Sequence, residues 1–386
     1  MSLSSSSTHE PMRTQVGTNG TGGAELRVSW VDAAKGICII FVVMMHSTLG
    51  VGIAMGGTGF MHDVVAFARP FRMPDFFLIS GLFLGLVIDR PWLRYIDRKV
   101  VHFLYFYVLW LSIQFVFKAP GMAMEDGWSA PLQEYLLAFV QPYGTLWFIY
   151  VLPLFFLFTR LVKRLPVWFV FAWAAVLEIM PVHTGWVIFD EFCARYVYFF
   201  VGYAFAQNVF HLAIWMRTYR KSAIAFLAWW AVVNGVLVFT PAPEMLAGLI
   251  PNDGAATGGT GGLAELPFIS LLLGLSGAVA VVAVASLVAA KDWAGWLSWL
   301  GAHSIVVYLA FFLPMAVTRV VLVRTGIITD IGLVALLVTI AGIVGPVILY
   351  LAVQKTGWGR FLFARPDWAW IDKTGKAKRA AAQPAE

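Results

Sequence analysis

The sequence predicts an all-α integral membrane protein with about ten transmembrane helices. Of its 386 residues, 60% are hydrophobic and 12% are charged, and the mean hydropathy is +0.79. A soluble domain is nearer half apolar and a quarter charged. The apolar residues gather in long stretches, and about 20 such residues cross a bilayer as a helix. Because only helices satisfy their own backbone hydrogen bonds at this length, an all-α fold follows.

The expected spans are assigned by length, since periodicity alone cannot separate a helix from a buried strand. The second and fifth are short, and the eighth is long enough to be tilted or partly interfacial. In chain order they cover roughly 36–55, 74–88, 100–119, 143–160, 166–181, 190–210, 222–240, 263–290, 295–318 and 328–353.

The distribution of basic residues predicts that both termini face the cytoplasm. With that orientation, most of the 27 Lys and Arg residues fall in inside segments, as the positive-inside rule requires. The net charge of +6 therefore reflects membrane topology, and no nucleic-acid partner is expected. The exceptions in the outside loops are Arg69, Arg72, Lys118, Arg319 and Arg324, and Arg195 lies within a span.

Polar ends flank the apolar region. Residues 1–26 are rich in Ser, Gly and Thr and lack the apolar run of a signal peptide, so we expect a disordered segment. Residues 27–354 form the transmembrane domain, and 355–386 form a basic cytoplasmic tail. The two cysteines, Cys38 and Cys193, lie in apolar blocks without metal-ligand spacing, so neither a disulfide nor a metal site is expected.

The first span, which contains "KGICIIFVVMMHSTLG", carries two ionisable side chains on one helix face. Lys35 and His46 are eleven residues apart, which is about 16 Å of helix rise and close to three turns. Ionisable residues inside a membrane default to a functional hypothesis, and histidine suits proton transfer near neutral pH. Alternatively, His46 only hydrogen-bonds a neighbouring helix, and Lys35 only snorkels to the interface.

Arginines mark the outer side of the second span. Arg69 and Arg72 are expected just before it, with Asp75 at its lip. Two arginines three positions apart share a helix face and can bind an oxyanion or sugar hydroxyls. The alternative is an interfacial basic pair that Asp63 and Asp75 neutralise. Within the span, the "SG" at residues 80–81 offers a small surface for close helix packing.

Further candidates lie in the neighbouring segments. The positive-inside rule explains most of the basic cluster near residues 90–102, although Arg98 and Lys99 are placed to bind phosphates beside Lys35. Trp147, at the outer end of the fourth span, is typical of an interfacial anchor, and with Arg69, Arg72 and Asp75 it is a candidate for the acceptor side of the site. Arg195 lies one turn from Glu191, a spacing that favours an ion pair between helix neighbours.

Five segments, in this order, resemble the acyltransferase-3 family of membrane proteins: "WVDAAKGICIIFVVMMH", "PDFFLISGLFLG", "GTLWFIYVL", "RYVYFFVGY" and "WLGAHSIVVYL". The resemblance covers about residues 27–353. Its most specific part is a basic residue, ten intervening residues and a histidine, here Lys35 and His46, with Asp32 as the preceding acidic residue. Members often carry Arg-x-x-Arg at the start of the third helix, whereas Arg98 and Lys99 here precede Val101 and His102. Many also carry a histidine in the ninth helix where this chain has Phe311 and Phe312.

The resemblance implies an O-acyltransferase in a bacterial inner membrane. It would move an acyl group, commonly acetyl or succinyl, from cytoplasmic acyl-CoA to a hydroxyl of an envelope carbohydrate. His46 would be the general base, and Lys35 would hold the donor or orient the first helix. Asp32, which precedes the basic position of the motif, is grouped with these two as a catalytic residue. Arg98 and Lys99 are the donor-binding candidates. Acyl-CoA would be a co-substrate, with no bound cofactor.

Two other functions remain open from the sequence. In a proton-coupled transporter or exporter of a small envelope metabolite, His46 would relay protons and Arg69 and Arg72 would bind an anionic cargo. A membrane scaffold without chemistry is the third possibility.

Overall fold

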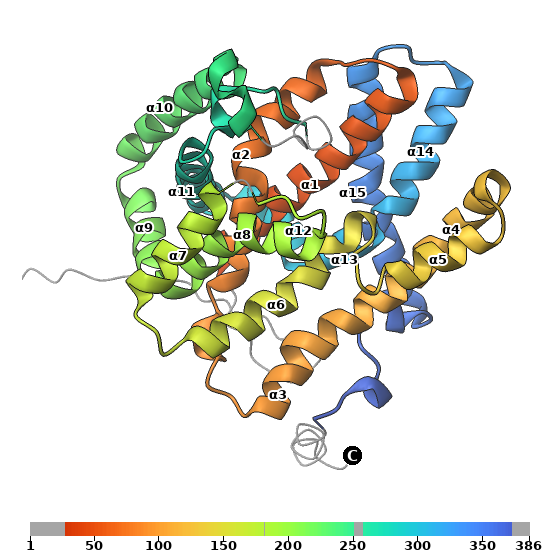
Figure 1. The fold of residues 1–386 in the computed structure, drawn as a ribbon, viewed down its shortest axis with the longest axis horizontal. Helices are drawn as coiled ribbons and strands as arrows, with labels where there is room; N and C mark the ends of the chain where they lie inside the picture. Colours follow the sequence, from red (N-terminus) through yellow and green to blue (C-terminus); the bar gives the residue numbers. More distant parts are fainter. Residues whose placement is uncertain (1–27, 181, 251–257, 373–386) are drawn as a thin grey trace, which may run out of the picture.

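The computed structural model describes residues 28–180, 182–250 and 258–372. Figure 1 shows its helices gathered around α1. No strand occurs among these residues, so the predicted all-α fold is confirmed. The predictions for residues 1–26 and 373–386 lie outside the described residues. The helices are α1 (Ser29–Met55), α2 (Phe60–Gly81), α3 (Trp92–Ile96), α4 (His102–Asp126), α5 (Ser129–Leu137), α6 (Trp147–Val162), α7 (Val167–Ile179), α8 (Val187–Ala204), α9 (Ala206–Thr218), α10 (Arg220–Phe239), α11 (Ile269–Val288), α12 (Gly295–Ala302), α13 (Ser304–Ala310), α14 (Phe312–Thr325) and α15 (Ile331–Thr356).

Each of the ten predicted ranges overlaps a helix, but not every helix is long and apolar enough to cross a membrane. Within the described ranges six are, or up to eight if each of two bent pairs forms one span. The bends are 76° between α8 and α9 and 52° between α13 and α14, and α7 has only 13 residues. Hydropathy counts apolar residues without detecting such bends. The count of ten and the orientation of the termini therefore stay predictions.

The prediction that Arg69 and Arg72 precede the second span is wrong. Helix α2 begins at Phe60, so both arginines and Asp75 lie within it. Arg72 is 4% exposed and Asp75, expected at the lip, is 1% exposed. Charged residues and two prolines lower the hydropathy of this segment, so hydropathy did not indicate the first half of α2. A helix with these charges is tolerated because its charged face turns toward other helices.

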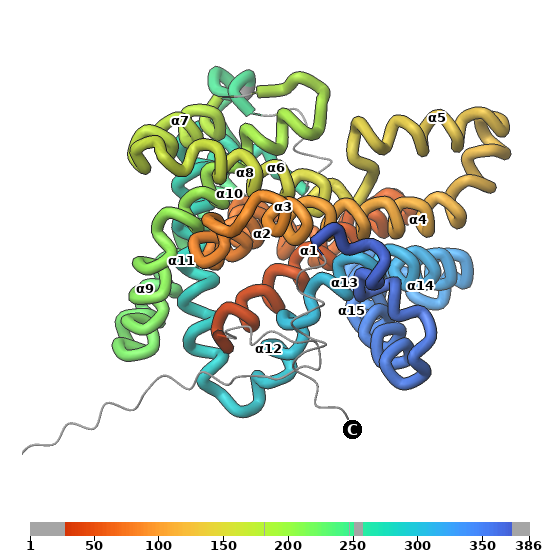
Figure 2. The backbone as a smooth tube through the Cα atoms, turned by 90° about the horizontal axis from the view of Figure 1, so that it is seen from below, coloured from red at the N-terminus to blue at the C-terminus, as the bar shows by residue number. Residues whose placement is uncertain are grey.

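Helix α1 occupies the centre of the bundle, with α2, α11, α12 and α15 packed around it (Figures 1 and 2). Glycines allow the backbones of neighbouring helices to approach most closely. Gly301 of α12 faces the carbonyl of Asp32, and Gly81 and Gly202 let the backbones of α2 and α8 touch, so none of these positions has room for a Cβ. The close packing expected at the "SG" segment is confirmed.

Part of the predicted cytoplasmic tail packs against the body of the protein. Residues 357–372 lie beside α4, and the buried guanidinium of Arg365 pairs with the buried carboxylate of Asp97. Arg365 Nη1 also donates to the Asp97 carbonyl oxygen at 2.7 Å, and the backbone N–H groups of Ile371 and Asp372 donate to its carboxylate at 3.1 and 3.2 Å. This segment holds the turn between α3 and α4, where a π-helical stretch spans Asp97–Val101.

Replacing Gly202 by alanine should destabilise the protein, because the new methyl group would collide with the Leu78 carbonyl of α2. We expect a loss of about 1–3 kcal/mol in unfolding free energy, seen as a lower Tm in detergent. Gly85→Ala is the matched control, because no atom lies within 4 Å of a Cβ there. Equal Tm values for the two variants would show that the α2–α8 contact is looser than described.

Candidate active site

Two cavities meet in the middle of the bundle. One, of about 390 Å³, is lined by His46 and is named the His46 cavity; the other, of about 370 Å³, is lined by Lys35 and is named the Lys35 cavity. Three side chains line both: Phe76, Phe148 and Tyr308. We name these three the aromatic partition. The histidine and the lysine of α1 therefore line different cavities, which adjoin at these three residues.

The aromatic partition is a packed cluster drawn from three helices. The rings of Phe76 in α2 and Phe148 in α6 meet edge-to-face at 4.7 Å between centroids, and Phe148 meets Tyr308 of α13 at 5.6 Å. The Tyr308 hydroxyl donates to the Thr145 carbonyl oxygen. Edge-to-face pairs of this kind are favourable contacts. The wall is therefore fixed both by ring packing and by a hydrogen bond.

His46 is open to the cavity that it lines. Its ring packs beside Phe311, with the centroids 5.5 Å apart. Within the described part of the chain, no hydrogen bond joins the imidazole to another residue. The alternative in which His46 only ties α1 to a neighbouring helix by a hydrogen bond is therefore not supported. An imidazole held by apolar packing keeps both nitrogens available to a ligand.

Lys35 forms an ion pair with Asp32, which lies one turn earlier on α1. The Lys35 ammonium lies 3.5 Å from the Asp32 carboxylate, and 34% of the Lys35 side chain is exposed. The pair brings together the acidic and basic residues of the first-span motif. Ser80, His102 and Ser304 are polar residues that share the Lys35 cavity.

The two donor-binding candidates lie near the Lys35 cavity but not in it. Arg98 is exposed on the π-helical turn before α4, and the Lys99 ammonium lies 4.4 Å from the centre of the Phe156 ring. Neither is among the described residues that line either cavity. Instead His102, a few positions further on, reaches the lining. The structure thus brings Lys35 together with His102.

The acceptor-side candidates divide between the cavity and the protein interior. Arg69, Arg72 and Trp147 line the His46 cavity, whereas Asp75 is buried and is not among its described lining residues. Both carboxylate oxygens of Asp75 are buried without a hydrogen-bond partner in the described structure. The two arginines and the tryptophan thus line the same cavity as His46.

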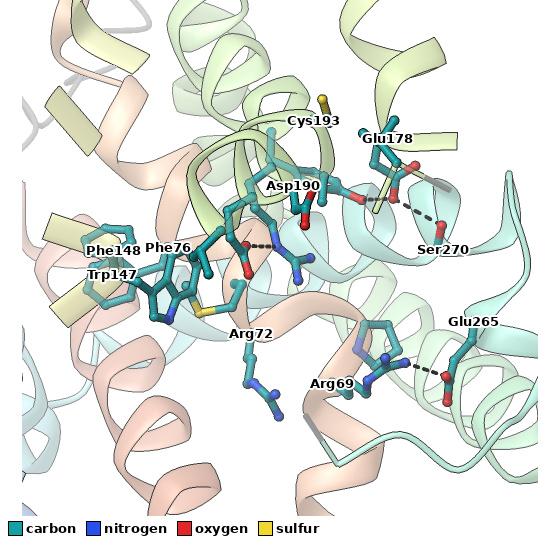
Figure 3. Close-up of a pocket in the computed structure, with 18 of the residues that line it drawn as sticks. Arg69, Arg72, Phe76, Trp147, Phe148, Glu178, Asp190, Cys193, Glu265 and Ser270 are labelled. Carbon is teal, nitrogen blue, oxygen red and sulfur yellow. Dashed lines mark hydrogen bonds and ion pairs between the residues drawn. The ribbon is translucent and has the colours of Figure 1, made fainter. Parts of the chain in front are cut away.

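Ion pairs hold two arginines of this site. Arg69 Nη1 lies 3.0 Å from Glu265 Oε2, which comes from the segment before α11 (Figure 3). Arg195 Nε lies 3.2 Å from Glu191 Oε2 one turn earlier on α8, so the predicted pair is confirmed. Pairing with carboxylates lowers the cost of burying these guanidinium groups.

Several residues of the His46 cavity were not singled out in the sequence. Glu178, in the last turn of α7, accepts hydrogen bonds from the hydroxyls of Tyr198 at 2.9 Å and Ser270 at 3.1 Å (Figure 3). Glu178 carried a usable signal, since it is ionisable and lies in the predicted span 166–181. Ser270 carried none, because hydroxyls are common in helices. No group of His, Cys, Asp and Glu able to hold a metal ion occurs among the described residues.

Comparison with known proteins identifies the family. A family model described as an acyltransferase domain matches residues 28–351. The chain belongs to the acyltransferase-3 family. It is 28% identical over 213 residues to "Nodulation protein NolL" of Sinorhizobium fredii, covering 54% of this chain and 57% of the relative. It is 26% identical over 207 residues to "Inner membrane protein YcfT" of Escherichia coli, covering 47% of this chain and 57% of the relative.

The matches to these two relatives span little more than half of the length of each. No solved structure matches the chain. The family match nevertheless covers all helices from α1 to most of α15. The resemblance stated from the sequence motifs is therefore confirmed, and this family member is a multi-pass membrane protein with apolar helices of spanning length.

Removing one partner of the Arg69–Glu265 pair should destabilise the protein more than removing both. Arg69→Met leaves Glu265, whose side chain is 4% exposed, without that cation, and Glu265→Leu leaves the arginine without that carboxylate. We expect the double variant to recover about 1–3 kcal/mol relative to the sum of the single changes. Thermal unfolding of the four proteins in detergent gives this coupling. Strictly additive changes in unfolding free energy would contradict the assigned pair.

Proposed function

We propose that this protein is an inner-membrane O-acyltransferase that moves an acyl group, acetyl or succinyl, from cytoplasmic acyl-CoA to a hydroxyl of an envelope carbohydrate. One observation carries the proposal: the Lys35 cavity and the His46 cavity approach each other from the two sides of the aromatic partition. A transfer between two sides of a membrane needs two sites that meet at one point. Family membership and the name of the Escherichia coli relative support the reaction class and the location.

In this proposal His46 acts as the general base. One imidazole nitrogen takes the proton of the acceptor hydroxyl, and the hydroxyl oxygen attacks the thioester carbonyl carbon. The tetrahedral intermediate collapses by breaking the carbon–sulfur bond, and the imidazolium returns the proton to the leaving CoA thiolate. The ester and free CoA are the products, and the enzyme regains its starting protonation state. The thioester and the hydroxyl would meet at the aromatic partition, whose three side chains line both cavities.

On the donor side, Lys35 is the cation best placed for acyl-CoA. It lines the Lys35 cavity, and its exposed fraction leaves the ammonium accessible. Arg98 and Lys99 lie outside the lining, so we place them at most along the approach of the CoA phosphates. Asp32 keeps Lys35 oriented through their ion pair. With both termini in the cytoplasm, as the basic residues predict, this cavity faces the cytoplasmic acyl-CoA.

A proton-coupled transporter is the second candidate, and one observation favours it. The helix pair α13–α14 bends by 52° at Phe311, and this residue packs against His46. Discontinuous helices beside a titratable group are features of transporters. In that function His46 would relay protons, and the two arginines of α2 would bind an anionic cargo.

The first experiment compares label transfer from radioactive acetyl-CoA or succinyl-CoA to the envelope glycan fraction in membranes carrying wild type or His46→Ala. Loss of a general base should reduce transfer by about 100-fold or more. His211→Ala, an exposed histidine of α9, is the control and should transfer normally. Persistent transfer by His46→Ala would remove its catalytic role. If wild type transfers neither label but supports proton-coupled uptake, the transporter is the function.

Lys35→Met should raise the KM for acyl-CoA about tenfold or more, since a charged hydrogen bond to a phosphate is lost. The KM for the acceptor should stay within twofold of wild type. Initial rates at varied acyl-CoA concentration measure the effect, and Lys291→Met, an exposed lysine, is the matched control. An unchanged KM for acyl-CoA would place the donor elsewhere.

A further inference from the structure

Glu178 presents one satisfied and one unsatisfied carboxylate oxygen. Its Oε1 accepts hydrogen bonds from the Tyr198 and Ser270 hydroxyls, which come from α8 and α11 and fix the orientation of the group. Its Oε2 is buried and has no hydrogen-bond partner in the described structure. A buried polar atom without a partner costs free energy, and more so when it is charged. A ligand that donates a hydrogen bond to Oε2 would remove this cost.

This unsatisfied oxygen belongs to a residue that lines the His46 cavity. Figure 3 shows Glu178 and Ser270 on one side of the site, with Arg69 and Glu265 on another. Because a carboxylate only accepts hydrogen bonds, its partner must be a donor. In a cavity that also holds a candidate base, a hydroxyl group of the acceptor is a donor of the required kind.

The charges around the cavity favour an uncharged ligand. Among the described lining residues, Arg69 and Arg195 pair with carboxylates, and Asp190 accepts from the backbone and hydroxyl of Thr184 and the N–H of Gly185. The site therefore compensates much of its charge internally, and its described lining has four carboxyl groups against three guanidinium groups, so it offers an anionic ligand no excess of positive charge. The acidic, basic and imidazole side chains in the described lining are Arg69, Arg72, Arg195, Glu178, Asp190, Glu191 and Glu265, with His46 and His183.

Aromatic surface lies next to these polar groups. Trp147, Phe76 and Phe148 line the same cavity, which has a volume of about 390 Å³. Small-molecule sites span about 300–1,000 Å³, so this one is at the small end of the range. A compact ring with an apolar face and a polar edge matches both the aromatic wall and the carboxylate.

We propose that Glu178 Oε2 accepts a hydrogen bond from a hydroxyl adjacent to the one that is acylated, and that the His46 cavity takes an uncharged polyhydroxyl ring. The inference rests on the proposed function, in which His46 removes the proton of the reacting hydroxyl. Glu178 thereby fixes the orientation of the ring in the cavity, so that one particular hydroxyl faces His46. It determines acceptor specificity and takes no part in binding acyl-CoA.

The test measures kinetics of Glu178→Gln with labelled acyl-CoA and the glycan fraction released from wild-type membranes. The amide removes the charge from Oε2, so we expect the KM for the glycan fraction to rise about tenfold or more. The KM for acyl-CoA and the hydrolysis of acyl-CoA without acceptor should stay within twofold. Glu125→Gln, an exposed glutamate of α4, is the matched control. An unchanged KM for the glycan fraction overturns the role of Glu178.

Competition tests the class of ligand. Methyl β-D-glucopyranoside should inhibit transfer to the glycan fraction at least tenfold better than methyl β-D-glucuronide, and Glu178→Gln should reduce that difference. Equal inhibition, stronger inhibition by the glucuronide, or none by either overturns the uncharged ring. Should Glu178→Gln fold poorly, Ser270→Ala removes one anchor of the carboxylate and should raise the same KM to a smaller extent.

The two levels of the proposal fail in different ways. If wild type transfers label but Glu178→Gln has an unchanged acceptor KM, only the inference is wrong. If wild type transfers no label, the acyltransferase proposal fails. Equilibrium dialysis of labelled methyl β-D-glucopyranoside with wild type and Glu178→Gln in phospholipid nanodiscs then decides the inference. Equal binding by the two proteins, or binding by neither, overturns it.

Discussion

The arrangement of this protein depends on the cost of placing polar side chains in hydrocarbon. A charged or hydrogen-bonding group at bilayer depth must face protein or a cavity, because lipid offers it no partner. Helix α1 meets this requirement by lying at the centre of the bundle, where α2, α11, α12 and α15 cover it. His46 and Lys35 therefore face cavities inside the protein. The glycines at the crossings of α1 with α12 and of α2 with α8 make this enclosure possible, since each contact is made by backbone.

The same constraint explains the paired charges of α2 and α8. Arg69 and Arg195 each lie against a carboxylate, and those pairs form part of the wall of the His46 cavity. Breaking such a pair leaves a buried charge, so both members are retained together. Glu178 differs, because in the described structure its second oxygen has neither an ion-pair partner nor a hydrogen-bond partner, whereas Glu265 and Glu191 each pair with an arginine. The paired groups therefore stabilise the wall of the cavity, whereas Glu178 is the group that we propose to bind the ligand.

The aromatic partition gives the proposed reaction its geometry. Phe76, Phe148 and Tyr308 come from α2, α6 and α13 and are the only described residues that both cavities share. Reactants that come from opposite sides would meet at this wall, with Lys35 on one side and His46 on the other. The bend after α13 lies next to it, at Phe311, which packs against the imidazole. The candidate base is thus coupled by direct packing to an irregular part of the helical framework.

The all-α membrane class, the family, and the placement of Lys35 and His46 about three turns apart on α1 could be predicted from the amino-acid sequence, because hydropathy and helical spacing are local properties. The Glu191–Arg195 pair could be predicted too, since its members are one turn apart. The start of α2 at Phe60 emerged only from the folded arrangement, since its charges and prolines conceal a helix whose polar face is covered by other helices. The same holds for Glu265 against Arg69 and for Glu178 and Ser270 in the lining of the His46 cavity, because contacts between distant helices leave no periodic signal in the chain.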